Sequence, residues 1–359
     1  MSARSVGAVA VAGITRPRWR PGRATAMAAG GSAALAAVLV AGVALGSVAV
    51  APGDTLGILA GRLLGLPVAA TWPASAETIV LDLRLPRVLT AMVAGLALSV
   101  AGATYQGLLR NPLADPYVLG TASGAALGAA IAIALPVRAL LPGFGLLHLL
   151  AFAGALGSVA LVYRLSRVSA LDSLAGLLLT GYAVGSLLAA GLAMAMTLSG
   201  ANLRQIVFYL LGGFGGSSWA GLAVAAPIIL AGSLLLILRA RRLDALLLGE
   251  ETAAHLGLDV RRERAIQLAL GALVTAAAVA TCGLVGFVGL VVPHVVRLAV
   301  GPGARLVLPL SALFGAAFLA AADLVARLPG ELPVGVVTAA VGAPFFLWLL
   351  RRARSGYEL

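Results

Sequence analysis

The stretch from Leu83 to Ala130 reads LRLPRVLTAMVAGLALSVAGATYQGLLRNPLADPYVLGTASGAALGAA. It contains two apolar runs that are each long enough to cross a bilayer, because a spanning helix needs about 20 mostly apolar residues. Arg84 and Arg87 precede the first run, and a polar turn at 111–116 separates the two. The stretch therefore predicts two membrane helices with a basic start and a turn that Pro112 and Pro116 hold out of helical conformation. We expect Pro86 to begin the first of them, because a proline is tolerated in the first helical turn.

The composition extends this prediction to the whole chain. Hydrophobic residues make up 61% of the 359 residues and charged residues 11%, against about 45–50% and about 25% in soluble domains. We therefore expect an all-α polytopic membrane protein. Charge-free runs predict ten spanning helices, at 27–50, 88–109, 117–136, 145–163, 174–198, 219–238, 265–283, 284–300, 306–326 and 332–350.

The boundary between the seventh and eighth spans, near Gly283, is the least marked. Residues 265–296 contain no charged residue, so hydropathy alone also allows nine spans. The arginines decide between the two counts. All 25 basic residues are arginine, and with ten spans and a cytoplasmic N-terminus 19 of them lie on the cytoplasmic side, as the positive-inside rule requires. The net charge of +12 is thus explained by topology, and no nucleic-acid partner is expected.

The chain divides into three parts on this interpretation. Residues 1–26 are expected to form a disordered cytoplasmic arm, 27–354 the ten-span domain and 355–359 a tail, with both termini cytoplasmic. Cys282 is the single cysteine, so no disulfide framework is expected.

Two segments between spans have their own helical pattern. In residues 239–264, leucines at 243, 246 and 247 fall at helical spacing, Gly249 can end that helix, and a second short helix can run from Glu250 to Leu256 before Gly257. We expect this pair, at about 243–259, to offer a surface to a soluble partner; a solvated basic loop is the alternative. Leu203–Leu211 predicts a further short helix, followed by a glycine-rich bend.

Six groups of motifs, in chain order, resemble the FecCD-type permease subunits of ATP-driven importers for iron-siderophore, haem and cobalamin complexes. They are LRLPR with QGLLRNPLADPYVLG and SGAALGA, NLRQIVFYLLGGFGGSSW (202–219), LGEETAAHLGLDV (248–260), GLVGFVGLVVPHVVRL (283–298), ADLVARL (322–328) and ELPVGVVTAAVGAPFFLWLL (331–350).

The resemblance implies a type II importer permease fold and a homodimer with the transport pathway along its axis. It also implies two ATP-binding-cassette ATPase subunits on the cytoplasmic side, which would bind ATP and Mg, and an extracytoplasmic substrate-binding protein. The chain itself would carry no cofactor and would lie in the lipid of a bacterial or archaeal cytoplasmic membrane. Iron-siderophore is the expected cargo, with haem or cobalamin as the alternatives.

The resemblance also implies roles for particular residues. Arg84, Arg87 and Arg327 would dock the binding protein, although interfacial arginines reaching the headgroups are the plainer reading. Asn111, Pro112 and Leu113 would form an inner gate, with Leu171–Ser173 a second constriction; an ordinary loop between helices is the alternative. Arg204 and Gln205 would face the substrate or the binding protein at the outer mouth, or else anchor the short helix at the membrane interface. The ATPase would contact Leu247, Gly249, Glu250, Glu251, Leu256 and Gly257, the last two in a packed turn. Independently, Asp323 and Arg327 stand one turn apart and can pair.

Some chemistry is missing from the sequence. Without lysine there is no phosphate-binding loop of the G-x-x-x-x-G-K-[ST] type, so ATP hydrolysis is not expected of this chain. The three histidines and Cys282 are scattered, and no metal site is predicted.

An intramembrane protease using Ser123 would need a neighbouring base, which no spacing supplies. A secondary transporter would favour charges at the midplane, whereas the large polar segment at 239–264 favours coupling to an ATPase.

Overall fold

The computed structural model describes residues 21–46, 48–63, 65–70, 72–135, 145–168, 174–328 and 330–354. The expected arm up to residue 20, the proposed constriction at Leu171–Ser173 and the tail at 355–359 lie outside these residues. The described part contains helices and connecting turns but no β-strand. Seven helical stretches are long and apolar enough to cross a membrane, and three shorter apolar helices accompany them.

Each of these ten lies on one expected span, which confirms the ten-span prediction. The long stretches are α1 (Pro21–Ala44), the run of α3 (Ala74–Thr78), η1 (Ile79–Arg84) and α4 (Leu85–Leu108), then α6 (Leu146–Val168), α7 (Leu174–Leu198), α9 (Trp219–Leu238), α12 (Val260–Cys282) and α14 (Ala304–Arg327). The shorter helices are α5 (Thr121–Ala134) and α13 (Val288–Val300), and the third shorter apolar segment is Val334–Leu349 within α15 (Val334–Arg354).

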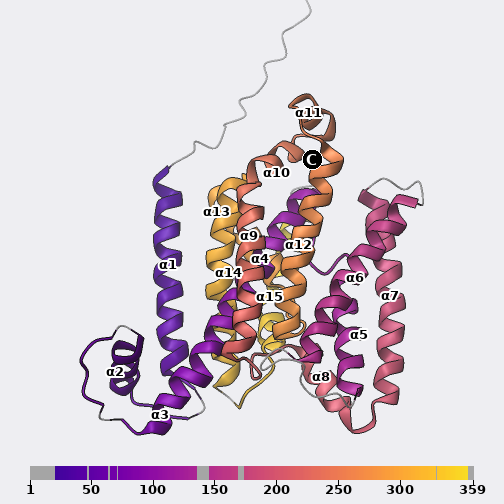
Figure 1. The fold of residues 1–359 in the computed structure, drawn as a ribbon. Coiled ribbons are helices and arrows are strands. Elements are labelled where there is room, and N and C mark those ends of the chain that lie inside the picture. The colour runs from indigo at the N-terminus through magenta and orange to yellow at the C-terminus, as the bar shows by residue number, and fades with distance from the viewer. Residues whose placement is uncertain are drawn as a thin grey trace, which may run out of the picture.

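The remaining helices lie at the two ends of the bundle. Figure 1 shows α10 (Ala240–Leu247) and α11 (Glu250–His255) at the end where α1 begins, which we call the α11 end. At the opposite end, the α8 end, lie α2 (Pro52–Leu63), α3, the 3₁₀ turn η2 (Gly200–Asn202) and α8 (Leu203–Leu211). The short helices expected at 203–211 and within 243–259 are therefore present.

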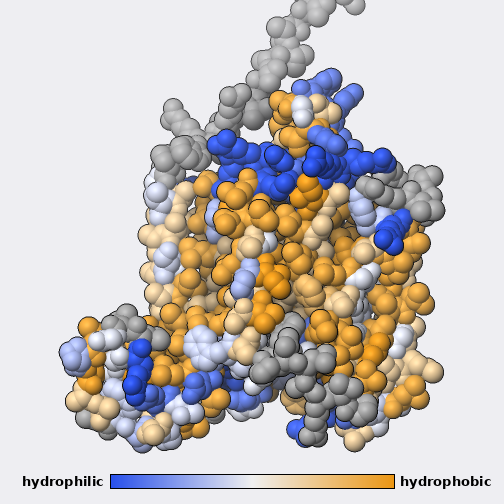
Figure 2. Space-filling view, in the orientation of Figure 1, coloured by the Kyte–Doolittle hydropathy of each residue, from blue (hydrophilic) through white to orange (hydrophobic). Residues whose placement is uncertain are grey.

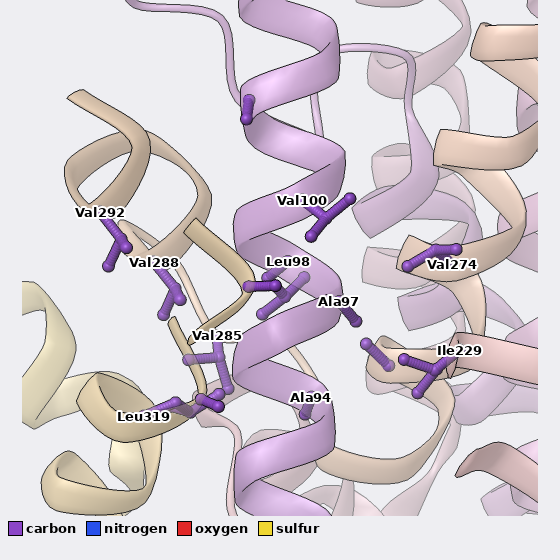
Figure 3. Packing of buried hydrophobic residues seen from close by; sticks show 14 of the residues in the cluster. Ala94, Ala97, Leu98, Val100, Ile229, Val274, Val285, Val288, Val292 and Leu319 are labelled. Carbon is purple, nitrogen blue, oxygen red and sulfur yellow. The ribbon is translucent and has the colours of Figure 1, made fainter. Parts of the chain in front are cut away.

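Helix α4, the first apolar run of the opening stretch, is the centre of the bundle. Figure 3 shows Ala97 and Leu98 of α4 between Val288 of α13 on one side and Ile229 of α9 and Val274 of α12 on the other. Small residues let neighbouring backbones approach closely: a Cβ on Gly102 would overlap the carbonyl oxygen of Gly289. Such close packing replaces the hydrophobic driving force that helices lack in lipid.

The start of the second span differs from the prediction. We expected Pro86 to begin the helix, but helical structure is continuous from Ala74, with a π-helical turn at Ile79–Arg84 before α4. Proline is tolerated there because it stands at the junction where the hydrogen-bond pattern changes from π to α, so its missing N–H removes no bond from a regular helix interior.

Helices α5 and α13 are shorter than the membrane is thick, and buried turns complete both spans. The α12–α13 break runs from Gly283 to Phe287, both with positive φ of 69°. The Tyr117 hydroxyl, from the turn before α5, donates to the Val285 carbonyl (3.0 Å) and accepts from the Val285 N–H (3.1 Å). Non-helical backbone at membrane depth is tolerated only where protein groups satisfy it in this way.

Candidate functional site

The three arginines predicted to form a docking patch lie together at the α8 end, but they point into the protein. Arg84 is 5% exposed and donates to the carbonyl oxygens of Val43 (3.1 Å), Ala44 (2.8 Å) and Val48. These are among the last carbonyls of α1 and the turn after it, where a helix leaves acceptors without partners and where positive charge is favourable. Arg84 therefore holds the end of α1 against α4.

Arg87 and Arg327 share one carboxylate. Asp323, buried on α14, accepts from Arg87 (3.0 Å) and pairs with Arg327 one turn later (3.1 Å), so the predicted Asp323–Arg327 pair is confirmed. Arg327 also donates to the carbonyl of Gly42 on α1 (3.1 Å). Arg87 reaches towards Glu331 (3.4 Å) and keeps 13% of its side chain exposed. Of the three arginines, Arg87 is the one that a partner could contact without rearrangement of this cluster.

The predicted gate lies in a turn at the α11 end, and side chains of the turn hydrogen-bond to its own backbone. The Asn111 carboxamide oxygen accepts from the N–H of Leu113 (2.9 Å), and the Asp115 carboxylate accepts from the N–H of Tyr117 (2.8 Å). Burial raises the pKa of the Asp115 carboxyl to about 6. Asn111, Pro112 and Leu113 are exposed, so they are free to face a second copy of the chain or a pathway.

A pair beside this turn was not identified from the sequence. Arg297 of α13 donates to the carboxamide oxygen of Gln106 and to the carbonyl of Ala103 (3.1 Å), and Gln106 in turn donates to the carbonyl of Gly289 (3.0 Å). Together with Pro112 they line a cavity of about 250 Å³. Both residues belong to motifs quoted above, QGLLRNP and PHVVRL, which is the signal that could have linked them.

Ion pairs to one buried carboxylate fix α10 to the bundle. Glu263 of α12 is 4% exposed and accepts from Arg239 (2.6 Å), which lies at the α9–α10 corner, and from Arg242 of α10 (3.0 Å). The carboxylate of Asp244 accepts from the N–H of Ala304, the first residue of α14 (2.7 Å). The sequence alone did not single out these acids, because their partners are distant along the chain.

The predicted partner surface is partly different from the expectation. Gly249 and Gly257 bound α11, as the sequence predicted, and both have positive φ; Leu243 and Leu246 are buried. Leu256, however, is not in a packed turn: it is 62% exposed. The buried residue of this turn is Ala253, because α11 has a single face against the protein and Leu256 follows its last residue on another side.

The exposed leucines at this end form an apolar tip. Leu247, Leu248 and Leu256 are 36%, 68% and 62% exposed, while Glu250 pairs with Arg264 and Glu251 is exposed. Figure 2 shows that the α11 end is a hydrophilic cap above a broad hydrophobic belt. Leucines that lie beyond such a belt, among charged residues, are typical of a surface that a soluble protein covers.

Helix α8 lies at the other end of the bundle, with its polar residues outward. Arg204 and Gln205 are exposed, and the Arg204 guanidinium lies 5.6 Å from the ring centroid of Phe208. Ile206 is buried, and the Tyr209 hydroxyl donates to the carbonyl of Val279 on α12 (2.9 Å). The glycine-rich bend that follows is hydrogen-bonded to the end of α12 and to the start of α15. The Gly213 N–H donates to the carbonyl of Cys282 (2.8 Å), and the Val334 N–H donates to the carbonyl of Gly212 (3.1 Å).

These features define a class: a polytopic all-helical membrane protein with a proline-bounded turn and two short helices at one end and a short amphipathic helix at the other. No group of three or more histidine, cysteine or acidic residues able to hold a metal ion occurs among the residues that the structure describes.

The comparisons with known proteins give the family. The model of the FecCD transport family matches residues 34–352, and the chain belongs to that family. It is 46% identical over 280 residues to the cobalamin import system permease protein of Halobacterium salinarum; the alignment covers 78% of this chain and 75% of that protein. It is 42% identical over 301 residues to the hemin transport system permease protein of Yersinia pestis, covering 81% and 90%.

A solved structure has the same fold. It is described as an inward-facing conformation of an ABC transporter of the metal-chelate type, and it aligns with a TM-score of 0.78 and 29% identity over 93% of this chain and all of that one. The family resemblance and the permease fold are thus confirmed, and the chain is a multi-pass transport protein of the cytoplasmic membrane.

Proposed function

We propose that the chain is the membrane permease subunit of an ABC importer that moves a metal chelate into the cytoplasm. Membership in the family supports this proposal, and so do the relatives, whose names concern cobalamin and hemin import. Those names favour a metal held in a macrocycle as the first cargo to test, ahead of the iron-siderophore expected from the sequence.

The observation that carries ATPase coupling is the apolar tip of α10–α11. It projects from an end where ion pairs to the buried Glu263 of α12 hold α10 in place, so a displacement of α10 by a partner is transmitted to α9 and α12. We infer that two ATPase subunits bind here, one for each copy of the permease, and hydrolyse the ATP. The α11 end is then cytoplasmic, in agreement with the arginine distribution.

A second copy of the chain is part of the proposal. Helix α7 exposes large apolar side chains along its length, with Leu179, Tyr182, Leu187 and Met194 each at least 64% exposed. A homodimer axis beside α7 would cover some of this surface and place a pathway between the copies, and an extracytoplasmic binding protein would deliver cargo at the α8 end.

Reconstitution tests the proposal. With its ATPase and binding protein in sealed vesicles, the transporter should take up cobalamin or haem only with ATP present, and uptake should persist when ion gradients are collapsed. Leu256→Asp should reduce ATPase copurification and uptake, because a carboxylate replaces an apolar contact. Leu66→Asp is the matched control for copurification, since Leu66 is similarly exposed (52%) and follows α2 at the α8 end.

Two results would contradict the proposal. Uptake driven by an ion gradient without ATP would identify a secondary transporter, the alternative considered above. Copurification of the ATPase with the Leu256→Asp variant at the wild-type level would remove the apolar tip from the coupling surface.

A further inference from the structure

A second cavity, of about 430 Å³, lies between α6, α7 and α12, away from the groups described above. Its lining is apolar and includes Val159 and Tyr163 of α6, Leu177 of α7, and Ala265, Leu268 and Ala272 of α12. The volume is within the range of about 300–1,000 Å³ found for small-molecule sites. Nothing in the proposed transport mechanism uses this cavity.

The sequence explains why the cavity lies in the half of the bundle nearer the α11 end. In the other half, small residues bring α6 and α12 into direct contact: Ala151 and Ala155 pack in one cluster with Ala276 and Ala280. Figure 1 shows the two helices drawing apart towards the α11 end. There α6 and α12 leave an apolar space between them at membrane depth.

Two positively charged side chains lie just beyond the apolar lining. Arg164 follows Ala160 of the lining by one helical turn on α6, and Arg261 precedes Ala265 by one turn on α12; both are exposed. Glu263, the nearest buried acid on α12, is engaged by Arg239 and Arg242. Tyr163 lies at the same level, and tyrosine is enriched at the depth of lipid headgroups.

We propose that this cavity holds an acyl chain of an anionic phospholipid from the leaflet at the α11 end, with the phosphate near Arg164 and Arg261. The apolar lining excludes a polar ligand, and the arginines select a negatively charged headgroup over a zwitterionic one. The bound chain fills the space between α6 and α12 that protein side chains leave open. The proposal does not depend on the identity of the cargo.

Photo-crosslinking of the full chain in vesicles, with its partner subunits present, tests the site. The probe is phosphatidylglycerol with a diazirine in one acyl chain, and phosphatidylcholine with the same chain is the comparison. Phosphatidylglycerol should label peptides around Val159–Tyr163 and Ala265–Ala272 several-fold more strongly. Arg164→Gln should lower that preference about fivefold, because one arginine near an anionic lipid is worth on the order of 1 kcal/mol.

Two further variants complete the test. Ala269→Phe, at an exposed position of the lining, should fill the cavity and remove labelling of these peptides while other peptides keep theirs. Arg351→Gln, at an exposed arginine of α15 near the same end, should leave the labelling unchanged. Equal labelling by both lipids, unchanged labelling in Ala269→Phe, or a disulfide between two copies carrying Ala269→Cys would overturn the lipid site; the last would show that a second chain covers it.

Discussion

Asp323 is the residue on which the α8 end depends most. One buried carboxylate pairs with both Arg87 and Arg327, and Arg327 also holds the end of α1. Asp323→Asn removes the negative charge but keeps the shape, so two guanidinium groups are left without their shared partner. Removing one member of a buried pair costs about 3–5 kcal/mol. We expect a clear fall in the thermal unfolding midpoint of the detergent-solubilised protein.

Glu77→Gln is the control for Asp323→Asn, because Glu77 pairs with Arg62 (2.7 Å) at the same end but in an exposed position. Solvent screens such pairs, so the midpoint should stay near that of the wild type. A similar fall in both variants would mean that the Asp323 cluster stabilises the fold no more than a surface pair does.

A substitution at Arg87 can test whether the arginines at the α8 end dock a binding protein as well as pair with Asp323. Its side chain is partly exposed, whereas Arg84 and Arg327 are buried. If an acidic binding protein docks here, Arg87→Gln should slow its association and reduce the salt dependence of that rate, since surface charges act mainly on encounter. Kinetics of binding to the permease in nanodiscs measure both. An association rate that matches the wild type at every salt concentration would leave Arg87 only its role beside Asp323.

At the scale of elements, the crossing of α4 and α13 has no room for a side chain. A Cβ on Gly102 would overlap the backbone of Gly289, so Gly102→Ala must push the two helices apart. We expect a loss of stability of at least 1–3 kcal/mol, the usual range for overpacking, measured as reduced yield of monodisperse protein and a lower unfolding midpoint. Gly157→Ala on α6 is the control, because a Cβ there meets no atom within 4 Å; equal losses in both would refute the steric argument.

The same elements show what the sequence could predict. The bounds of α7, α8 and α9 agree with those expected, because each apolar run ends at polar residues or glycines that local rules recognise. The π-turn before α4 was missed, since no local signal distinguishes Pro86 at a helix start from Pro86 at a junction. The Gln106–Arg297 and Arg239–Glu263 contacts were missed for another reason: they join residues far apart in the chain, and only the packing of helices decides which polar groups meet.

At the scale of the whole molecule, hydrogen bonds connect the proposed ATPase contact at α10 with the proposed gate at the Asn111 turn. Arg110, directly before the Asn111 turn, donates to the carbonyl of Leu246 in α10 (2.7 Å), and the Asn111 N–H donates to Gln106 of α4 (3.1 Å). A partner that moves α10 therefore pulls on the turn that we expect to gate the pathway. Such a link supports coupling only if both ends respond to the same event.

Disulfide trapping between two copies carrying Asn111→Cys measures that response. Cys282, which is buried, is replaced by alanine so that it cannot react. If the turn is a gate, the crosslinking rate should differ between nucleotide-free and ATP-bound transporter, and adding Arg110→Ala should reduce the difference, because α10 then loses its hold on the turn. Leu66→Cys, which follows α2 on the side of the bundle away from α7, should give no crosslink with or without nucleotide. If crosslinking at position 111 were equally indifferent to nucleotide, the turn would be a static loop and the gate would have to lie elsewhere along the pathway.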